Sequence, residues 1–311
     1  MLRRYTTALL LVINLLTLGV VATGQAPQEK VDLEVINKMK DEGLNRSQVM
    51  EILSYMTDVF GPRLTGSPNY REASEWAAKK LESWGLQNAK LEPWGQFGRG
   101  WTLEGFSANM IKPHFSPIIA YPKAWSGSTN GTVRGQVIYL DAKTEADLEK
   151  YRGKLKGAIV LIAPSREVKA QFQPQAIRES DEELLRLANA EPPSGGAQRR
   201  NFQASPEQRA AMALLNKKWE MVYSEGAAVV LETSRVGDGG TIFLGSATLS
   251  YPPNTPADQR KSVRDKDAPP VIPQLVVTVE HYNRIIRMLD KGVPVQLEVN
   301  VNARYHDQDL T

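Results

Sequence analysis

The stretch Gly61-Pro62-Arg63-Leu64-Thr65-Gly66-Ser67-Pro68 decides how the N-terminal part of this chain folds. Gly61-Pro62 predicts the end of any preceding helix, because proline lacks an N–H and disfavours helical geometry one residue back. Ser67-Pro68 predicts a new helix, with Ser67 as N-cap and Pro68 at the first helical position. Gly85 is expected to end that helix. An apolar face recurs at helical spacing between these signals and consists of Ala73, Trp76, Ala77, Leu81 and Trp84.

Length and composition place the chain among ordinary globular proteins. Its 311 residues allow about two domains, and 41% hydrophobic and 23% charged residues are typical of such folds. A net charge of +3, with lysines and arginines scattered among acids, argues against a nucleic-acid partner. The absence of cysteine excludes disulfides, cysteine-bound metal and thiol catalysis.

Residues 1–24 have the pattern of a secretory signal peptide. Arg3 and Arg4 precede an apolar run over 8–22, and small residues follow it. A membrane anchor is the alternative, but the run is shorter than the ~20 residues that span a bilayer. We therefore expect a cleaved signal, a secreted or periplasmic protein, and contact with the membrane only through that signal.

The rest of the chain predicts helices and short strands in alternation. Two helices are expected over 31–60, the first ending at Gly43 and the second capped by Asn45 or Ser47. Further helices are expected over 144–151, 179–190 and 280–289, and one that begins at the capping box Ser205-Pro206-Glu207-Gln208. Strands are expected over 90–94, 106–111, 118–121, 135–140, 157–162, 227–231, 271–279 and 293–301. The polar stretch 171–205 interrupts this alternation.

The string GPRLTGSPNYREASEWAAKKLESWGL, residues 61–86, resembles the N-terminal region of secreted two-zinc exopeptidases of the carboxypeptidase Q and aminopeptidase group. Three later strings resemble the protease-associated (PA) domain inserted into those enzymes: KGAIVLI, EGAAVVLETS and VIPQLVVTVEHYNRIIRMLDKGVPVQLEVNV. The resemblance covers about residues 45–311, apart from 171–205.

The resemblance implies a mixed α/β (α+β) fold. It has the helical edge of an α/β zinc-exopeptidase domain over 31–115, a β-rich PA domain with flanking helices over 116–300, and a link over 301–311 towards the catalytic core. It also implies a metallopeptidase that hydrolyses peptide bonds at chain ends, with zinc as cofactor and a peptide as substrate. The PA domain would shape substrate access or a homodimer interface.

The metal ligands of that family are not visible in this sequence. A two-zinc site needs imidazole and carboxylate ligands, and the family's first ligand motif is His-x-Asp after a core strand. None of His114, His281 and His306 begins such a motif. We interpret His114 as a loop residue and His281 as a surface or capping residue. His306-Asp307-Gln308-Asp309 gathers ligand types, but its spacing is wrong and no core strand is expected directly before it.

Other candidate sites are weaker. Gly237-Asp238-Gly239-Gly240 is a glycine-rich turn without a following helix, which argues against a phosphate cradle. Ser224 and Ser246 lack a partner histidine. The acidic run 179–183 is typical of a solvated helix face, and three tryptophans in Gly-rich segments could line a groove: Trp94, Trp101 and Trp125. We therefore predict no catalytic, cofactor-binding or metal-binding residue here, and no zinc bound to this chain.

Two hypotheses remain open for the function. Either the chain is the N-terminal portion of a zinc exopeptidase whose ligands lie beyond Thr311, or it is an exported binding module that has the same fold and no catalysis. A reading frame that continues past Thr311 into a His-x-Asp strand would favour the first hypothesis, and a natural stop codon there would favour the second.

Overall fold

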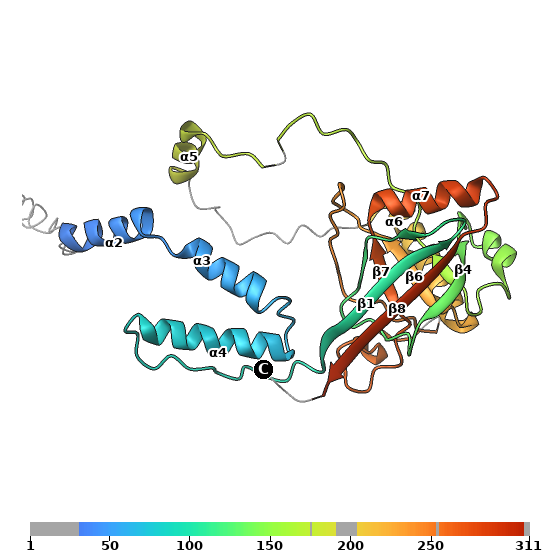
Figure 1. Ribbon diagram of the computed structural model, residues 1–311, viewed down its shortest axis with the longest axis horizontal. Helices are drawn as coiled ribbons and strands as arrows, with labels where there is room; N and C mark the ends of the chain where they lie inside the picture. Colours follow the sequence, from blue (N-terminus) through green and yellow to red (C-terminus); the bar gives the residue numbers. More distant parts are fainter. Residues whose placement is uncertain (1–30, 175, 191–203, 253–254, 308–311) are drawn as a thin grey trace, which may run out of the picture. The chain divides into compact units, whose positions relative to one another are not determined.

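The computed structural model describes residues 31–174, 176–190, 204–252 and 255–307 (Figure 1). The predicted signal peptide, Gln308 and Asp309 lie outside these residues. No helix in the described part is long and apolar enough to cross a membrane. The chain divides into two compact units, 1–59 and 60–311, which are described separately.

The first unit contains helices, as the sequence predicts. Helix α2 (Leu33–Asn45) begins at Asp32, whose side chain accepts hydrogen bonds from the backbone N–H groups of Glu34 and Val35. A short helix α3 (Val49–Ser54) continues into a π-helical turn, η1 (Tyr55–Val59). No described residue of these helices is buried, so residues 31–59 form no core of their own.

Two details of this unit differ from the prediction. Gly43 does not end α2, which continues to Asn45. Nothing lies within 4 Å of the position its Cβ would occupy, and a glycine in an exposed helix costs only about 1 kcal/mol relative to alanine. The N-cap of α3 is Gln48, which makes no capping hydrogen bond through its side chain, although Val49 N–H approaches Ser47 Oγ at 3.4 Å.

The second unit opens with helix α4 (Pro68–Ser83), where the sequence predicts it. Ser67 is the N-cap and accepts a hydrogen bond from Tyr70 N–H. Gly85 adopts φ +88° just after the C-cap residue Trp84. Ala73 is buried, and Trp76 packs edge-on against Phe60 with 5.9 Å between ring centres. The start and the end of this helix are therefore confirmed, whereas its predicted apolar face is buried only at Ala73, and Leu81 and Trp84 are exposed.

An eight-stranded mixed sheet dominates the second unit, with strand order β2-β1-β8-β4-β5-β6-β7-β3. Its strands are β1 (Gly100–Lys112), β2 (Ser116–Pro117), β3 (Ala120–Pro122), β4 (Val133–Tyr139), β5 (Ile159–Leu161), β6 (Val229–Thr233), β7 (Gln274–Val277) and β8 (Gln296–His306). Strands β4 to β7 are parallel neighbours. The long strands β1 and β8 are antiparallel and run side by side in Figure 1, from Gly100 opposite His306 to Lys112 opposite Gln296.

Helices cover both faces of the parallel strands. They are α6 (Pro206–Glu225) and α7 (Val279–Asp290). The unit also contains the 3-10 turns η2 (Ala146–Tyr151) and η3 (Ala257–Gln259) and the helix α5 (Asp181–Ala188), which has no buried residue. Ile159 and Leu161 of β5 pack in one core with α7, whereas Val160 packs in a second core with α6. Successive strand residues point to opposite faces, so α6 and α7 lie on opposite sides of the sheet.

The mixed α/β class is confirmed by this sheet, but two strand predictions need correction. Residues 90–94 form no strand, because Pro93 lacks an N–H for pairing and Gly95 and Gly98 follow closely. Strand β8 runs to His306, beyond the expected end at 301, so a sheet strand does lead directly into His306. The domain limits at 115/116 and 300/301 stay a prediction; the sheet itself includes β1 before the first limit and the end of β8 after the second.

Candidate functional site

The stretch that opens α4 packs against the start of β1 through two glycines. A Cβ on Gly100 would lie 1.9 Å from the carbonyl oxygen of Gly66, and one on Gly66 would lie 3.2 Å from Gly100 Cα. Gly66 also has φ +78°, a conformation that favours glycine. Ser67 is buried beside them. The Thr-Gly-Ser loop therefore fixes the N-terminus of α4 at the edge of the sheet.

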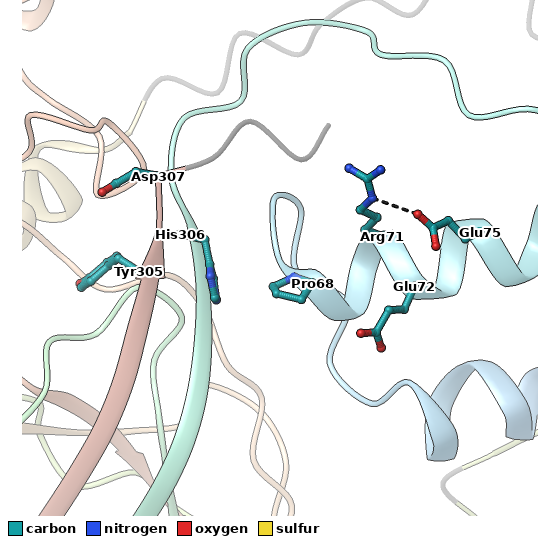
Figure 2. A pocket seen from close by; sticks show the side chains of 7 residues that line it. All are labelled: Pro68, Arg71, Glu72, Glu75, Tyr305, His306 and Asp307. Atoms are coloured by element: carbon teal, nitrogen blue, oxygen red, sulfur yellow. Dashed lines mark hydrogen bonds and ion pairs between the residues drawn. The ribbon is translucent and has the colours of Figure 1, made fainter.

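A small open pocket of about 480 Å³ lies at this junction (Figure 2). Its lining consists of Pro68, Arg71, Glu72 and Glu75 of α4 and of Tyr305, His306 and Asp307 at the end of β8. Arg71 Nε donates to Glu75 Oε1 at 2.9 Å. His306 Nε2 lies 2.9 Å from Thr102 Oγ1 on the neighbouring strand. Figure 2 shows Tyr305 and Asp307 directed away from α4.

This pocket holds ligand types but not a metal site. Within the part of the chain that the structure describes, no group of three or more His, Asp or Glu side chains is arranged to hold a metal ion. The imidazole of His306 is engaged by Thr102, and the carboxylate of Glu75 by Arg71. These residues therefore do not fit the two-zinc centre that the sequence resemblance implies.

The other two histidines lie near one another on α7 and the turn after β1. His281 Nδ1 accepts a hydrogen bond from Ile119 N–H at 3.0 Å. Burial, with Arg284 as a second cause, lowers the pKa of His281. His114 Nε2 lies 2.6 Å from a guanidinium nitrogen of Arg284. His281 thus holds the segment between β2 and β3 against α7, and His114 lies in the loop after β1, as expected.

The remaining sequence candidates have structural roles. Gly239 N–H donates to Glu280 Oε1 at 2.6 Å, which ties the glycine-rich turn to α7. Ser224 donates to the backbone of its own helix. Trp101 and Trp125 do not line a groove: both are buried in a third core, and their indole N–H groups donate to Ser126 O and Arg99 O. Trp94 is 70% exposed.

A larger cleft of about 1700 Å³ lies where the parallel strands end. Its lining includes residues that follow three of these strands, namely 141–145 after β4, 162–167 after β5 and 232–235 at the end of β6. Helix α6 forms one wall with Ala210, Ala211, Leu214 and Leu215, and the segment 243–248 contributes Ser246 among others. Ligands of open α/β sheets bind outside the carboxyl ends of the strands, so this cleft has the position of a binding site.

Two buried lysines distinguish the cleft. Lys123 Nζ donates to Glu232 Oε2 at 2.6 Å and lies 5.7 Å from the Trp219 ring. Lys218 is 8% exposed, and burial lowers its pKa, opposed by the charge of Asp141. None of the ion pairs within 4 Å among the described residues includes Lys218. The cleft therefore combines a buried lysine in a close ion pair with a buried lysine that has Asp141 nearby but forms no ion pair within 4 Å among the described residues.

The sequence reasoning did not single out these residues. Glu232 follows the apolar run 227–231, and a polar residue at the carboxyl end of a buried strand is a signal that could have found it. Lys218 follows Lys217 and precedes the buried Trp219 on α6, and such a lysine pair carries no distinguishing pattern. Lys123 is brought to Glu232 only by the pairing of β3 with β7.

No family model matches the sequence, and no curated protein matches it. Solved structures do show likeness. A peptidase M28 precursor from Shewanella amazonensis SB2B is 15% identical, with a TM-score of 0.46, and the match covers 88% of this chain and 51% of that one. An aminopeptidase from Aneurinibacillus sp. strain AM-1 is 14% identical, with a TM-score of 0.38, over 86% of this chain and 48% of that one. A zinc aminopeptidase from Bacillus subtilis is 10% identical, with a TM-score of 0.38, over 82% and 44%.

The chain thus spans about half the length of these solved structures. All three are peptidases by description. At these identities and TM-scores the likeness does not by itself assign an activity to this chain.

Proposed function

We propose that this chain is the N-terminal portion of a secreted zinc exopeptidase similar to carboxypeptidase Q. In this proposal the PA domain, expected over 116–300, is extended to the whole sheet from Gly100 to His306. The observation that carries this proposal is the pairing of Gly100 with His306. The chain enters and leaves the sheet at neighbouring positions, as a domain inserted into another domain must. The resemblance of 61–86 and of the later strings supports the same arrangement.

The zinc centre belongs to the whole enzyme in this proposal. Bound zinc would polarise the peptide carbonyl and generate hydroxide at neutral pH. The described residues do not fit such a centre, so we place its ligands beyond Thr311. Residues 1–311 would supply the glycine junction that fixes α4 on the sheet. They would also supply a PA domain that shapes either the access of peptides or a dimer interface.

The experiment that tests the proposal compares the chain with the natural gene product. Purified 1–311 should contain no stoichiometric zinc and should not release terminal residues from peptides, whereas the natural product should do both and should lose its activity to a chelator. Metal-dependent hydrolysis by 1–311 would contradict the placement of the ligands. A natural product that ends at Thr311 would contradict the peptidase assignment.

An exported binding module without catalysis is the second candidate, and one observation favours it. The two larger cores draw all their residues from 103–303, so the sheet domain has an interior of its own without any catalytic partner. A stop codon directly after Thr311, together with a stable 1–311 product in the culture medium or periplasm, would select this candidate.

A further inference from the structure

Helix α5 is an amphipathic segment whose apolar face has no partner among the described residues. Leu184, Leu185 and Leu187 are 51%, 64% and 50% exposed, and no residue of the helix is buried. Its first turn is acidic, with Asp181, Glu182 and Glu183 after the N-cap Ser180. An isolated helix this short is unstable in water, and most helical stability comes from packing of such a face. The sequence therefore provides a helix that needs a surface to cover it.

The cleft at the carboxyl ends of the strands has the complementary chemistry. Its α6 wall is apolar, and Leu244 and Phe243 add exposed apolar area. Buried within its lining is Lys218, which feels the charge of Asp141 but forms no ion pair within 4 Å among the described residues. Arg166, also in the lining, has a buried Nε without a hydrogen-bond partner. An occupant with leucines and carboxylates would satisfy both the apolar wall and these cations.

The chain connects α5 to the cleft on both sides. Glu167 before it and Glu207 after it both line the cleft. The stretch 168–180 can span about 40 Å when extended, and the stretch 189–206 more than that. A segment tethered so closely has an effective concentration of about millimolar, which favours it over an acidic segment from another molecule.

We propose that α5 docks in this cleft, with its leucine face against α6 and its acidic first turn beside Lys218. Docking covers the apolar face of α5 and gives Lys218 a carboxylate partner. The cleft is thus occupied by a segment of the same chain, which an incoming ligand has to displace.

Cysteine cross-linking tests the docking directly, because the chain has no cysteine of its own. Ala188 lies one turn after Leu184 on the same side of α5, so Ala188→Cys reports the leucine face. It is paired in turn with Ala210→Cys, Ala211→Cys or Ala213→Cys, which line the cleft, and with Met212→Cys, an exposed neighbour on α6 outside the lining. The four positions are consecutive on α6, so the lengths of chain that join them to α5 are nearly the same.

Docking predicts a disulfide within one chain for at least one lining position, formed about tenfold or more faster than with Met212→Cys. Leu184→Ser should slow the formation of this disulfide. Lys218→Gln should slow it too, and its effect should be larger at low salt than at high salt. Lys150→Gln, outside the cleft, serves as the charge control and should have no effect. Leu184→Ser alters only an exposed residue, so it tests the docking even where Lys218→Gln impairs folding.

Equal rates at the lining and control positions would overturn the proposal. Disulfides that link two chains and increase with protein concentration would overturn it as well, because they would assign the cleft to a second copy. Neither outcome depends on peptidase activity.

Discussion

At the scale of single residues, the contact between Gly66 and Gly100 explains why the stretch 61–68 has a glycine at position 66. The two backbones approach so closely that a side chain at either glycine would meet the backbone at the other. The stretch therefore acts as a docking loop for α4. None of its residues needs to take part in catalysis for this role.

We predict that Gly100→Ala destabilises the protein by about 1–3 kcal/mol or more, because its Cβ would lie 1.9 Å from Gly66 O, a backbone atom that cannot move alone. Urea unfolding followed by tryptophan fluorescence measures the change. Gly105→Ala in the same strand is the control, since its Cβ would meet only Asn302 Cβ at 3.8 Å. Equal stability of the two variants would show that the junction is not tightly packed.

The Lys123–Glu232 pair makes a second prediction at this scale. Glu232→Gln leaves the ammonium of Lys123 buried without its carboxylate, which we expect to cost about 3 kcal/mol. Arg134→Gln, which breaks the exposed pair with Glu298, should cost less than about 1 kcal/mol. Similar losses for the two variants in denaturant unfolding would contradict the burial of the first pair.

At the scale of elements, His281 links α7 to the segment between β2 and β3. Its pKa is lowered by burial and by Arg284, while Glu280 opposes the shift. Below the ordinary histidine pKa of about 6.5 the unfolded chain binds the proton more readily than the folded one. The stability that His281 contributes is therefore complete above about pH 6.5 and is lost as the pH falls through its folded pKa.

We predict that thermal stability falls between pH 7 and pH 5 and that His281→Gln makes this fall shallower. His114→Gln is the comparison variant, because His114 lies exposed beside the same Arg284. Melting temperatures measured across this range check the prediction. An unchanged slope in His281→Gln would show that the Ile119 hydrogen bond does not depend on neutral imidazole.

Local signals predicted the elements far better than their pairing. Ser67-Pro68 and Ser205 to Gln208 placed two helix starts, because capping is decided within a few residues. The extension of β8 to His306 is not predicted, although the apolar residues Val299, Val301 and Ala303 alternate beyond the expected end at 301. The polar residues on the other face, Asn300, Asn302 and Arg304, obscure this alternation. No pattern in the sequence could place Lys123 against Glu232, since strand order β7-β3 depends on the whole sheet.

At the scale of the whole molecule, the two units differ in how much they bury. Residues of α2 and α3 are all at least partly exposed, whereas β1 and β8 pair along their length and contribute residues to two buried cores. We predict that amides of α2 and α3 exchange with solvent deuterium within seconds, and those of β5, β6 and β8 at least about a thousandfold more slowly. Hydrogen exchange of the intact chain measures both, and equal protection would contradict an independent sheet domain.

Native mass spectrometry of the protein purified from its natural source tests the central claim most directly, because it gives the chain mass and the number of bound metal ions together. The account predicts a chain clearly heavier than the 34.5 kDa of these 311 residues, with two zinc ions that a chelator removes along with exopeptidase activity. A chain of 34.5 kDa or less that carries no zinc would contradict it and leave the binding module as the function of this fold.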